Sequence, residues 1–154
     1  MRFTFAPFAC LFFTAVAASG AIAADEIEIN LRQFEQGQLL TAQTSQGVIW
    51  IIYRTDMALA TIDAARQYPI VGADPSPSRN KYRSIERKYF VVYPACPKFM
   101  ELPHYDQTTG FTCISAGTKY DLTGRPLSNS DGATPMRVPV YRFKDQYTIV
   151  LPTK

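Results

Sequence analysis

Histidine is almost absent from this chain, and cysteine and tryptophan are scarce. The 154 residues include 1 His, 3 Cys and 1 Trp. A Ser–His–Asp arrangement for nucleophilic catalysis could therefore use only His104. Glycine-rich phosphate loops are also missing, and no pair of carboxylates stands out as a general acid and base. The sequence thus favours a protein that is not an enzyme.

Clustered charge of one sign is missing as well. The formal net charge is +3, from 16 Lys and Arg against 13 Asp and Glu. Because no basic run is interleaved with aromatic residues, we expect no nucleic-acid binding. Residues 79–88 are locally basic, with Lys81, Arg83, Arg87 and Lys88. We interpret this stretch as a solvated connection, and the alternative is a docking patch for an acidic partner.

The longest hydrophobic run lies at the N-terminus. It spans residues 3–18, follows Arg2, and is succeeded by Ala21 and Ala23 in a small–x–small pattern. This order predicts a signal peptide over residues 1–23, cleaved after Ala23, and export by the general secretory route to the periplasm or beyond. An uncleaved membrane anchor is the alternative, since about 20 uncharged residues can span a bilayer. Residues 24–154 then form one domain.

Signal cleavage changes the number of available cysteines. Cys10 leaves with the signal peptide, so that Cys96 and Cys113 remain. Two cysteines in an exported domain most often form a disulfide. This bond would close a loop of about 18 residues and contribute about 3 kcal/mol to stability. A redox-active pair and metal ligation are the alternatives.

Short alternating or apolar stretches, together with frequent proline and tyrosine, predict an all-β sandwich or barrel. The predicted strands are residues 26–30, 38–42, 48–53, 89–93, 111–113, 136–143 and 146–151. The strand over 48–53 is apolar throughout and should be central, and the last two strands should form a hairpin through Lys144 and Asp145. One short helix is predicted over 57–66, with Asp56 as its N-cap. Residues 68–78 contain three prolines and predict a loop, and 102–110 predict a turn-rich return.

The order of these pieces resembles the extrinsic Rieske iron–sulfur domain of cytochrome bc1 complexes. Residues 38–55, QLLTAQTSQGVIWIIYRT, are similar to a strand pair of that family ending in Arg-Thr. Residues 117–125, GTKYDLTGR, are similar to the family motif G-S-H-Y-D-x-S-G-R, and 132–135 resemble its proline loop. The resemblance covers essentially all of residues 24–154. It implies antiparallel sheets, one short helix, and a small loop subdomain whose tip carries the cluster.

The two cluster-binding boxes of the family are only partly matched. The first box reads C-T-H-L-G-C, and residues 96–101 read CPKFME. Cys96 matches the first cysteine ligand, whereas Lys98 stands at the position of the histidine ligand and Glu101 at that of a second cysteine. The protonated amine of Lys98 is not a metal ligand, so the first box supplies no substitute for its histidine. The second box decides whether the other histidine ligand is present.

The second box of the family reads C-P-C-H-G-S, and residues 113–118 read CISAGT. Cys113 matches the cysteine ligand. Ser115 replaces the partner in the family's loop disulfide, and Ala116 replaces the second histidine ligand. A Rieske centre needs two thiolates and two imidazoles, and the chain has only His104, at a position that the family fills with an apolar residue.

The resemblance therefore implies a domain without its cluster. We expect no cofactor and no metal, and interpret Cys96 and Cys113 as remnant ligand positions. In the family both thiolates bind one iron and lie close together, which implies a structural disulfide when the iron is gone. The N-terminus also lacks the twin arginine typical of the export of folded cluster proteins. On this interpretation we expect neither the family's membrane anchor nor its hinge.

We predict an exported, cluster-free Rieske-like domain that acts as a non-catalytic binding or accessory module. Its partner should be a protein, and a membrane-associated respiratory partner fits the resemblance. One alternative is a [2Fe-2S] electron-transfer protein similar to the ubiquinol–cytochrome c reductase iron–sulfur subunit, with unorthodox ligands; another is a thiol–disulfide redox protein. We expect Phe99, Met100 and Leu102 to fill the space left by the cluster; the alternative is that they make the tip apolar.

Overall fold

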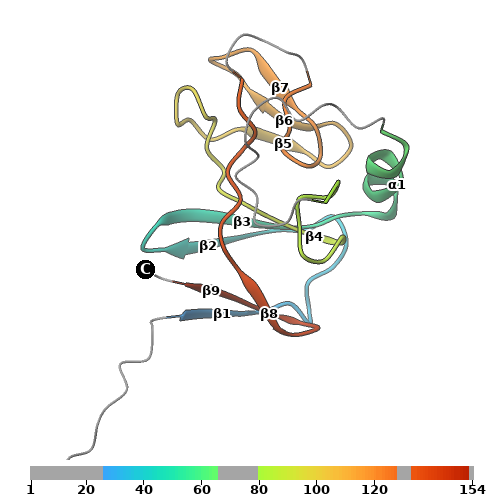
Figure 1. Ribbon diagram of the computed structural model, residues 1–154, viewed down its shortest axis with the longest axis vertical. Helices are drawn as coiled ribbons and strands as arrows, with labels where there is room; N and C mark the ends of the chain where they lie inside the picture. Colours follow the sequence, from blue (N-terminus) through green and yellow to red (C-terminus); the bar gives the residue numbers. More distant parts are fainter. Residues whose placement is uncertain (1–25, 66–79, 128–132, 153–154) are drawn as a thin grey trace, which may run out of the picture.

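The described part of the chain is an all-β domain with one short helix, as predicted (Figure 1). The computed structural model describes residues 26–65, 80–127 and 133–152. The predicted signal peptide 1–23 and the proline-rich loop 68–78 lie outside these ranges. Within them the strands form three antiparallel sheets of three strands each, stacked along the long axis of the molecule.

We call the three sheets the base, central and tip sheets. In the base sheet, β9 (Thr148–Pro152) lies between β1 (Glu26–Asn30) and β8 (Arg142–Asp145). In the central sheet, β3 (Gly47–Tyr53) lies between β2 (Leu39–Thr44) and β4 (Tyr89–Val92). In the tip sheet, β6 (Gly110–Cys113) lies between β5 (His104–Asp106) and β7 (Thr118–Tyr120). Neighbouring strands are close in sequence in most pairs, which favours short hairpins.

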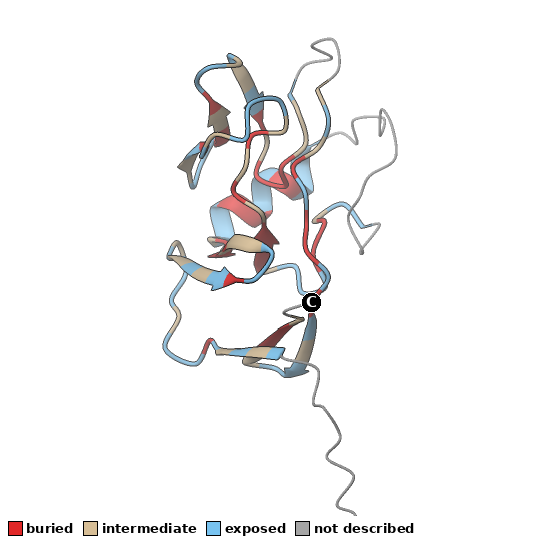
Figure 2. Ribbon diagram, turned by 90° about the vertical axis from the view of Figure 1, so that its left-hand side faces the viewer, coloured by how far each residue is buried: buried red, intermediate tan, exposed pale blue. Residues whose placement is uncertain are grey.

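One hydrophobic core runs through all three sheets (Figure 2). All four residues of β4 are buried, so this strand contributes a continuous run of apolar side chains to the core in the middle of the domain. Ile51 of β3, Phe111 of β6 and Ile149 of β9 belong to the same cluster. Because the core is shared, the tip sheet is fixed to the rest of the domain by packing as well as by chain connection.

The helix α1 (Asp56–Ala64) begins one residue earlier than predicted. Thr55, not Asp56, is the N-cap: its hydroxyl oxygen accepts a hydrogen bond from the backbone N–H of Ala58 at 3.1 Å. Asp56 instead lies in the first turn, where a negative charge complements the helix dipole. Among the residues that the structure describes, no helix has the length and apolar character needed to cross a membrane.

The basic stretch is not the solvated connection we expected. Arg83 and Ser84 are fully buried, and Arg83 has a positive φ of 52°. Its guanidinium donates to the carbonyl oxygens of Thr123 and Met136, both at 2.7 Å. The neighbouring cations Lys81 and Arg87 are exposed, which fits the prediction for that part of the stretch.

A second guanidinium, that of Arg54 at the end of β3, is also buried. It donates to the carbonyl oxygens of Arg87, Tyr82 and Leu122 at 2.9, 2.8 and 3.2 Å, and lies 4.7 Å from the ring centroid of Phe90. Desolvation lowers the pKa of Arg54 to about 10, so the group stays protonated at neutral pH. The two arginines join the central sheet to the turn that follows the tip sheet.

The C-terminal part differs most from the prediction. The strand predicted over 136–143 is regular only in β8, and the hairpin turns at residues 146–147 rather than at Lys144 and Asp145. Residues 133–141 are outside regular strands, in part because Pro135 and Pro139 lack the N–H that a ladder requires. The three-residue strands β5 and β7 were not predicted from the sequence.

Gly110 provides a test of how tightly the tip sheet is packed. Its φ is +99°, and a Cβ there would lie 2.3 Å from the carbonyl oxygen of Tyr120. We expect Gly110→Ala to lower the free energy of unfolding by about 2–4 kcal/mol, measured by chemical denaturation. Gly47→Ala is the control, because Gly47 has φ +116° with nothing within 4 Å of a Cβ; strain alone should cost about 1–2 kcal/mol. Equal losses would contradict the close approach.

Candidate functional site

The candidate site is the tip formed by two loops, residues 94–103 after β4 and residues 114–117 between β6 and β7. A disulfide joins them through Cys96 and Cys113, with an S–S distance of 2.02 Å and a Cα–Cα distance of 5.8 Å. Both cysteines are buried, at 0% and 1% exposure. The predicted disulfide is therefore confirmed.

Local turns place the two cysteines. The first loop closes on itself, because the N–H of Cys96 donates to the carbonyl of Glu101 and the N–H of Met100 donates to that of Cys96, both at 2.8 Å. Met100 adopts a positive φ of 55° in this turn. The second loop turns at Gly117, whose φ of 63° suits a residue without Cβ and whose N–H donates to the carbonyl of Ile114. Both cysteines thus stand at the bases of tight loops.

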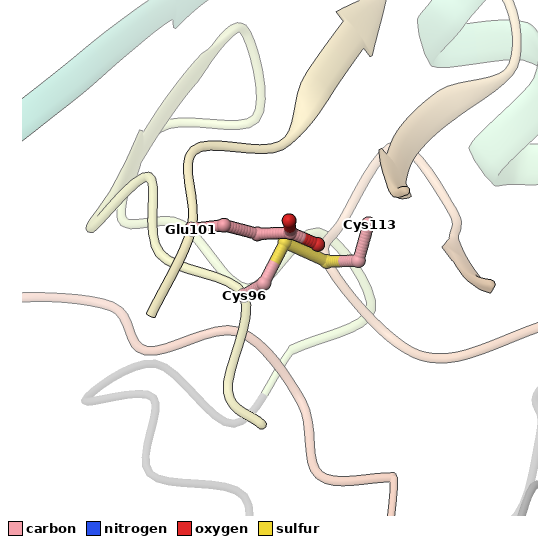
Figure 3. Close-up of side chains that lie close together, drawn as sticks. All are labelled: Cys96, Glu101 and Cys113. Atoms are coloured by element: carbon pink, nitrogen blue, oxygen red, sulfur yellow. A yellow bond between two sulfur atoms is a disulfide. The ribbon is translucent and has the colours of Figure 1, made fainter. Parts of the chain in front are cut away.

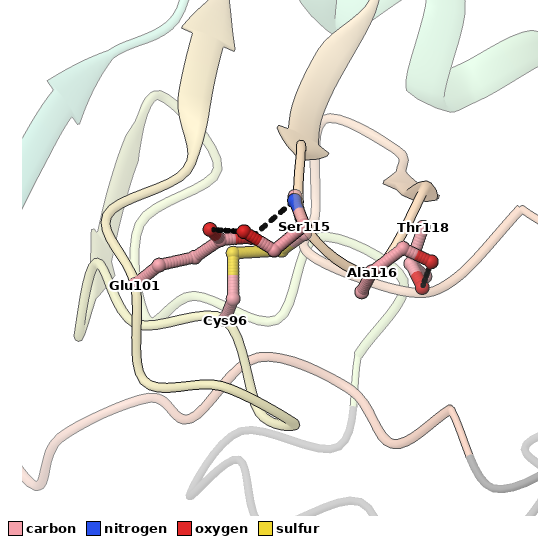
Figure 4. Close-up of a disulfide and its surroundings, with 6 residues drawn as sticks. Cys96, Glu101, Ser115, Ala116 and Thr118 are labelled. Atoms are coloured by element: carbon pink, nitrogen blue, oxygen red, sulfur yellow. Dashed lines mark hydrogen bonds between the residues drawn. A yellow bond between two sulfur atoms is a disulfide. The ribbon is translucent and has the colours of Figure 1, made fainter.

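A hydrogen-bonded pair makes a second link between the same loops (Figure 4). The carboxylate of Glu101 accepts a 2.9 Å hydrogen bond from the backbone N–H of Ser115 and a short one from the Ser115 hydroxyl. These two residues stand at the positions where the resemblance places the loop disulfide. The sequence reasoning treated them only as two losses. Both positions of the family's loop disulfide are substituted at once, by a hydrogen-bond acceptor at Glu101 and a donor at Ser115. This joint substitution is the signal in the sequence that could have identified the pair.

The Glu101 carboxylate also lies beside the disulfide (Figure 3). One carboxylate oxygen and the sulfur atoms of Cys96 and Cys113 all lie within 4.8 Å of one another. Among the described residues this is the only such group of potential metal ligands. His104 is outside it: the side chain is exposed on β5, where the residue pairs with Thr112.

The positions that correspond to the two histidine ligands offer no imidazole. Lys98 is exposed, and its amine lies 5.4 Å from the ring centroid of Phe99. Ala116 is half-buried and packs against the core. A Rieske centre requires two thiolates and two imidazoles. With the sulfurs of Cys96 and Cys113 bonded to each other, these residues do not fit that cluster.

The tip surface is apolar, which corrects one expectation. Phe99, Met100 and Leu102 do not fill an internal space: they are 52%, 75% and 67% exposed. Ile114, from the second loop, is 77% exposed. We call these four side chains the apolar tip patch. The buried disulfide belongs to the core and the half-buried Ala116 packs against that core, whereas these larger side chains are exposed.

Residues of the matched motif stabilise the turn after β7. Tyr120 is buried, and one carboxylate oxygen of Asp121 accepts hydrogen bonds from the backbone N–H groups of Thr123 and Arg125 at 2.7 and 3.0 Å. The Arg125 side chain donates to the carbonyl of Lys81 at 2.8 Å. The residues that match the family motif therefore stabilise the backbone of this turn. The residues that differ from the family stand at its ligand positions.

Fold, turn motif and tip together define a Rieske-like domain. The chain is 23% identical over 154 residues to the ubiquinol–cytochrome c reductase iron–sulfur subunit of Allochromatium vinosum, a match that covers 88% of this chain and 73% of that protein. This similarity confirms the resemblance inferred from the motifs. No family model matches the chain. A solved chain of a hyperthermophilic respiratory Complex III aligns with a TM-score of 0.49 and 14% identity, over 79% of this chain and 71% of that one.

We expect the disulfide to be the stronger of the two links between the loops. The double variant Cys96→Ala, Cys113→Ala should lose about 2–4 kcal/mol of unfolding free energy, because the unfolded chain is no longer cross-linked. Ser115→Ala, which removes only the hydroxyl hydrogen bond, should lose about 0.5–1.5 kcal/mol. Denaturant unfolding measures both. The wild type with a reductant should match the double variant, and a wild type indifferent to the reductant would contradict the assignment.

Proposed function

We propose that this chain is an exported, cluster-free Rieske-like domain that acts as a non-catalytic binding or accessory module. The observation that carries the proposal is the buried Cys96–Cys113 disulfide, because it consumes the two thiolates that a cluster would need. Lys98 and Ala116 at the histidine positions support it further. The signal peptide that the sequence predicts over residues 1–23 favours export, and a stable disulfide is compatible with an exported protein.

The binding surface that we propose is the apolar tip patch. Exposed apolar side chains gathered on adjacent loops are typical of protein interaction sites. Phe99 and Met100 come from one loop and Ile114 from the other, and the disulfide and the Glu101–Ser115 pair hold the loops together. A pre-ordered surface loses little conformational entropy on binding. The patch is therefore suited to insertion into an apolar recess of a partner.

The partner that we propose is a membrane-associated respiratory protein. The basis is the relative from Allochromatium vinosum, which is described as a subunit of ubiquinol–cytochrome c reductase. Lys98, exposed next to the patch, adds a positive charge at its rim and favours a recess with an acidic edge. Electron transfer through a [2Fe-2S] cluster would need a broken disulfide and ligands from elsewhere. A catalytic role in thiol–disulfide exchange with other proteins is disfavoured, because both cysteines are buried away from a protein substrate.

The cluster-free state is tested on protein exported with its own signal sequence. We expect no visible iron–sulfur absorption, no stoichiometric iron, no free thiol after unfolding without reductant, and an N-terminus at Ala24. The thiol result follows because Cys96 and Cys113 are bonded and Cys10 lies in the removed segment. Red-brown absorption with iron in proportion to protein would overturn the proposal, and two rapidly reacting thiols would favour a redox role instead.

The tip patch is tested by a double variant, Phe99→Ser, Met100→Ser, in the tagged full-length chain. We expect it to reduce co-purification of ubiquinol–cytochrome c reductase from detergent-solubilised membranes at least about tenfold, since buried anchors dominate interface energy. Haem spectra and peptide mass spectrometry identify the complex. Met57→Ser is the control, because Met57 is 67% exposed on α1, outside the patch. Equal recovery with both variants, or no recovery with the wild type, would contradict the proposed interface.

A further inference from the structure

The tip holds three potential metal ligands that become available together when the disulfide is reduced. The sulfurs of Cys96 and Cys113 and a carboxylate oxygen of Glu101 already lie within 4.8 Å of one another. In a tetrahedral zinc site, with Zn–S of about 2.3 Å and Zn–O of about 2.0 Å, ligand atoms lie about 3.3–3.8 Å apart. Reaching this arrangement needs the two sulfurs to separate from 2.02 Å, and any carboxylate–sulfur distance near the 4.8 Å limit to shorten by about 1 Å.

We propose that the reduced chain binds one Zn²⁺ through the Cys96 and Cys113 thiolates and the Glu101 carboxylate. The two thiolates favour a borderline cation such as Zn²⁺ over Mg²⁺ or Ca²⁺. Three protein ligands leave a fourth position for water, which can enter because Ile114 and Ser115 on the second loop are exposed. The site is mononuclear and uses Glu101, so it is distinct from the two-thiolate, two-imidazole chemistry of a Rieske centre.

Ser115 has the position of an outer-shell residue in this site. Its N–H and hydroxyl both donate to the Glu101 carboxylate, which fixes the orientation of that carboxylate beside the sulfurs (Figure 4). Metal-bound carboxylates are commonly held in this way by further hydrogen bonds. The first loop also holds Glu101 through its own carbonyl, which accepts from the N–H of Cys96 at 2.8 Å. Two ligands are thereby placed by one closed loop.

Zinc binding and disulfide formation exclude each other because they use the same sulfurs. A dithiol reductant transfers two electrons to the Cys96–Cys113 bond: it becomes a disulfide, and two protein thiols form. Binding of Zn²⁺ to these thiols then releases two protons. In the reverse direction, a disulfide oxidant takes two electrons from the thiolates, the sulfurs bond to each other, and Zn²⁺ leaves. The two loops of the tip can therefore be cross-linked in two alternative ways, by the disulfide or by a bound metal ion.

The test uses the full chain, reduced without oxygen and freed of reductant, with Co²⁺ as a spectroscopic probe and Zn²⁺ as its competitor. We expect one Co²⁺ per chain with thiolate-to-cobalt charge-transfer absorption, full displacement by one Zn²⁺, and release of two protons per Zn²⁺. The apparent Kd for Zn²⁺ should be below about 1 µM at neutral pH. Bound Zn²⁺ should also slow re-formation of the disulfide by an added oxidant.

Two variants assign the third ligand. Glu101→Gln should weaken Zn²⁺ binding at least about tenfold, and Ser115→Ala should weaken it less. Glu86→Gln is the matched control, since it makes the same charge change at an exposed residue outside the group. Normal disulfide formation in each oxidised variant verifies folding. Equal affinities of Glu101→Gln and Glu86→Gln, absence of charge-transfer absorption, or Zn²⁺ binding weaker than millimolar would overturn the inference. Iron content of the oxidised protein and recovery of its partner are separate readouts, so failure here is distinguishable from failure of the proposed function.

Discussion

The Cys96–Cys113 bond is the constraint on which the tip depends. It brings together a loop that leaves β4 and a loop that leaves β6, and it buries both sulfurs. While these sulfurs are paired with each other, neither is available as a thiolate ligand. The disulfide lies in the core, the half-buried Ala116 packs against it, and the apolar tip patch faces solvent. The disulfide thus joins the two loops that carry the apolar tip patch.

Two buried guanidinium groups fix the tip sheet on the rest of the domain. Arg54 comes from the end of the central sheet, Arg83 comes from the loop before β4, and each donates to carbonyls in the turn after β7. Removing a charge from water is costly, and the fall in the pKa of Arg54 reflects that cost. Charge-assisted bonds to several carbonyls offset it. Since these carbonyls belong to distant segments, the arginines stabilise one arrangement of the segments above others.

Sequence reasoning was accurate where the determinants are local. The strand Glu26–Asn30, the hairpin of β2 and β3, and the apolar β4 follow from alternation, turn residues and an uninterrupted apolar run. Sequence reasoning failed for features that depend on contacts between residues far apart in the sequence. The strands β5 and β7 have three residues each, too few for a periodicity, and they exist because β6 pairs with both. The burial of Arg83 depends on carbonyls 40 and 53 residues away, which no local pattern reveals.

At the site, the sequence predicted which residues depart from the family motif but not what they do instead. The cysteine pairing could be inferred, because two ligands of one iron must be near neighbours. The exposure of Phe99 and Met100 could not be inferred, since it depends on how the folded loop packs against the rest of the domain. The contact between Glu101 and Ser115 required both loops in place. Side-chain direction in a tight loop follows from tertiary packing, and composition does not determine it.

The two links across the tip act together on the relative orientation of the loops. A single covalent link between two loops leaves them free to pivot about that link, whereas a second link at some distance along the loops removes the pivot. The Glu101–Ser115 hydrogen bonds provide this second link beside the disulfide. Phe99 belongs to the first of these loops and Ile114 to the second, and both side chains are exposed. The two links therefore constrain how these apolar side chains lie relative to each other, which is the geometric basis of the binding surface that we propose.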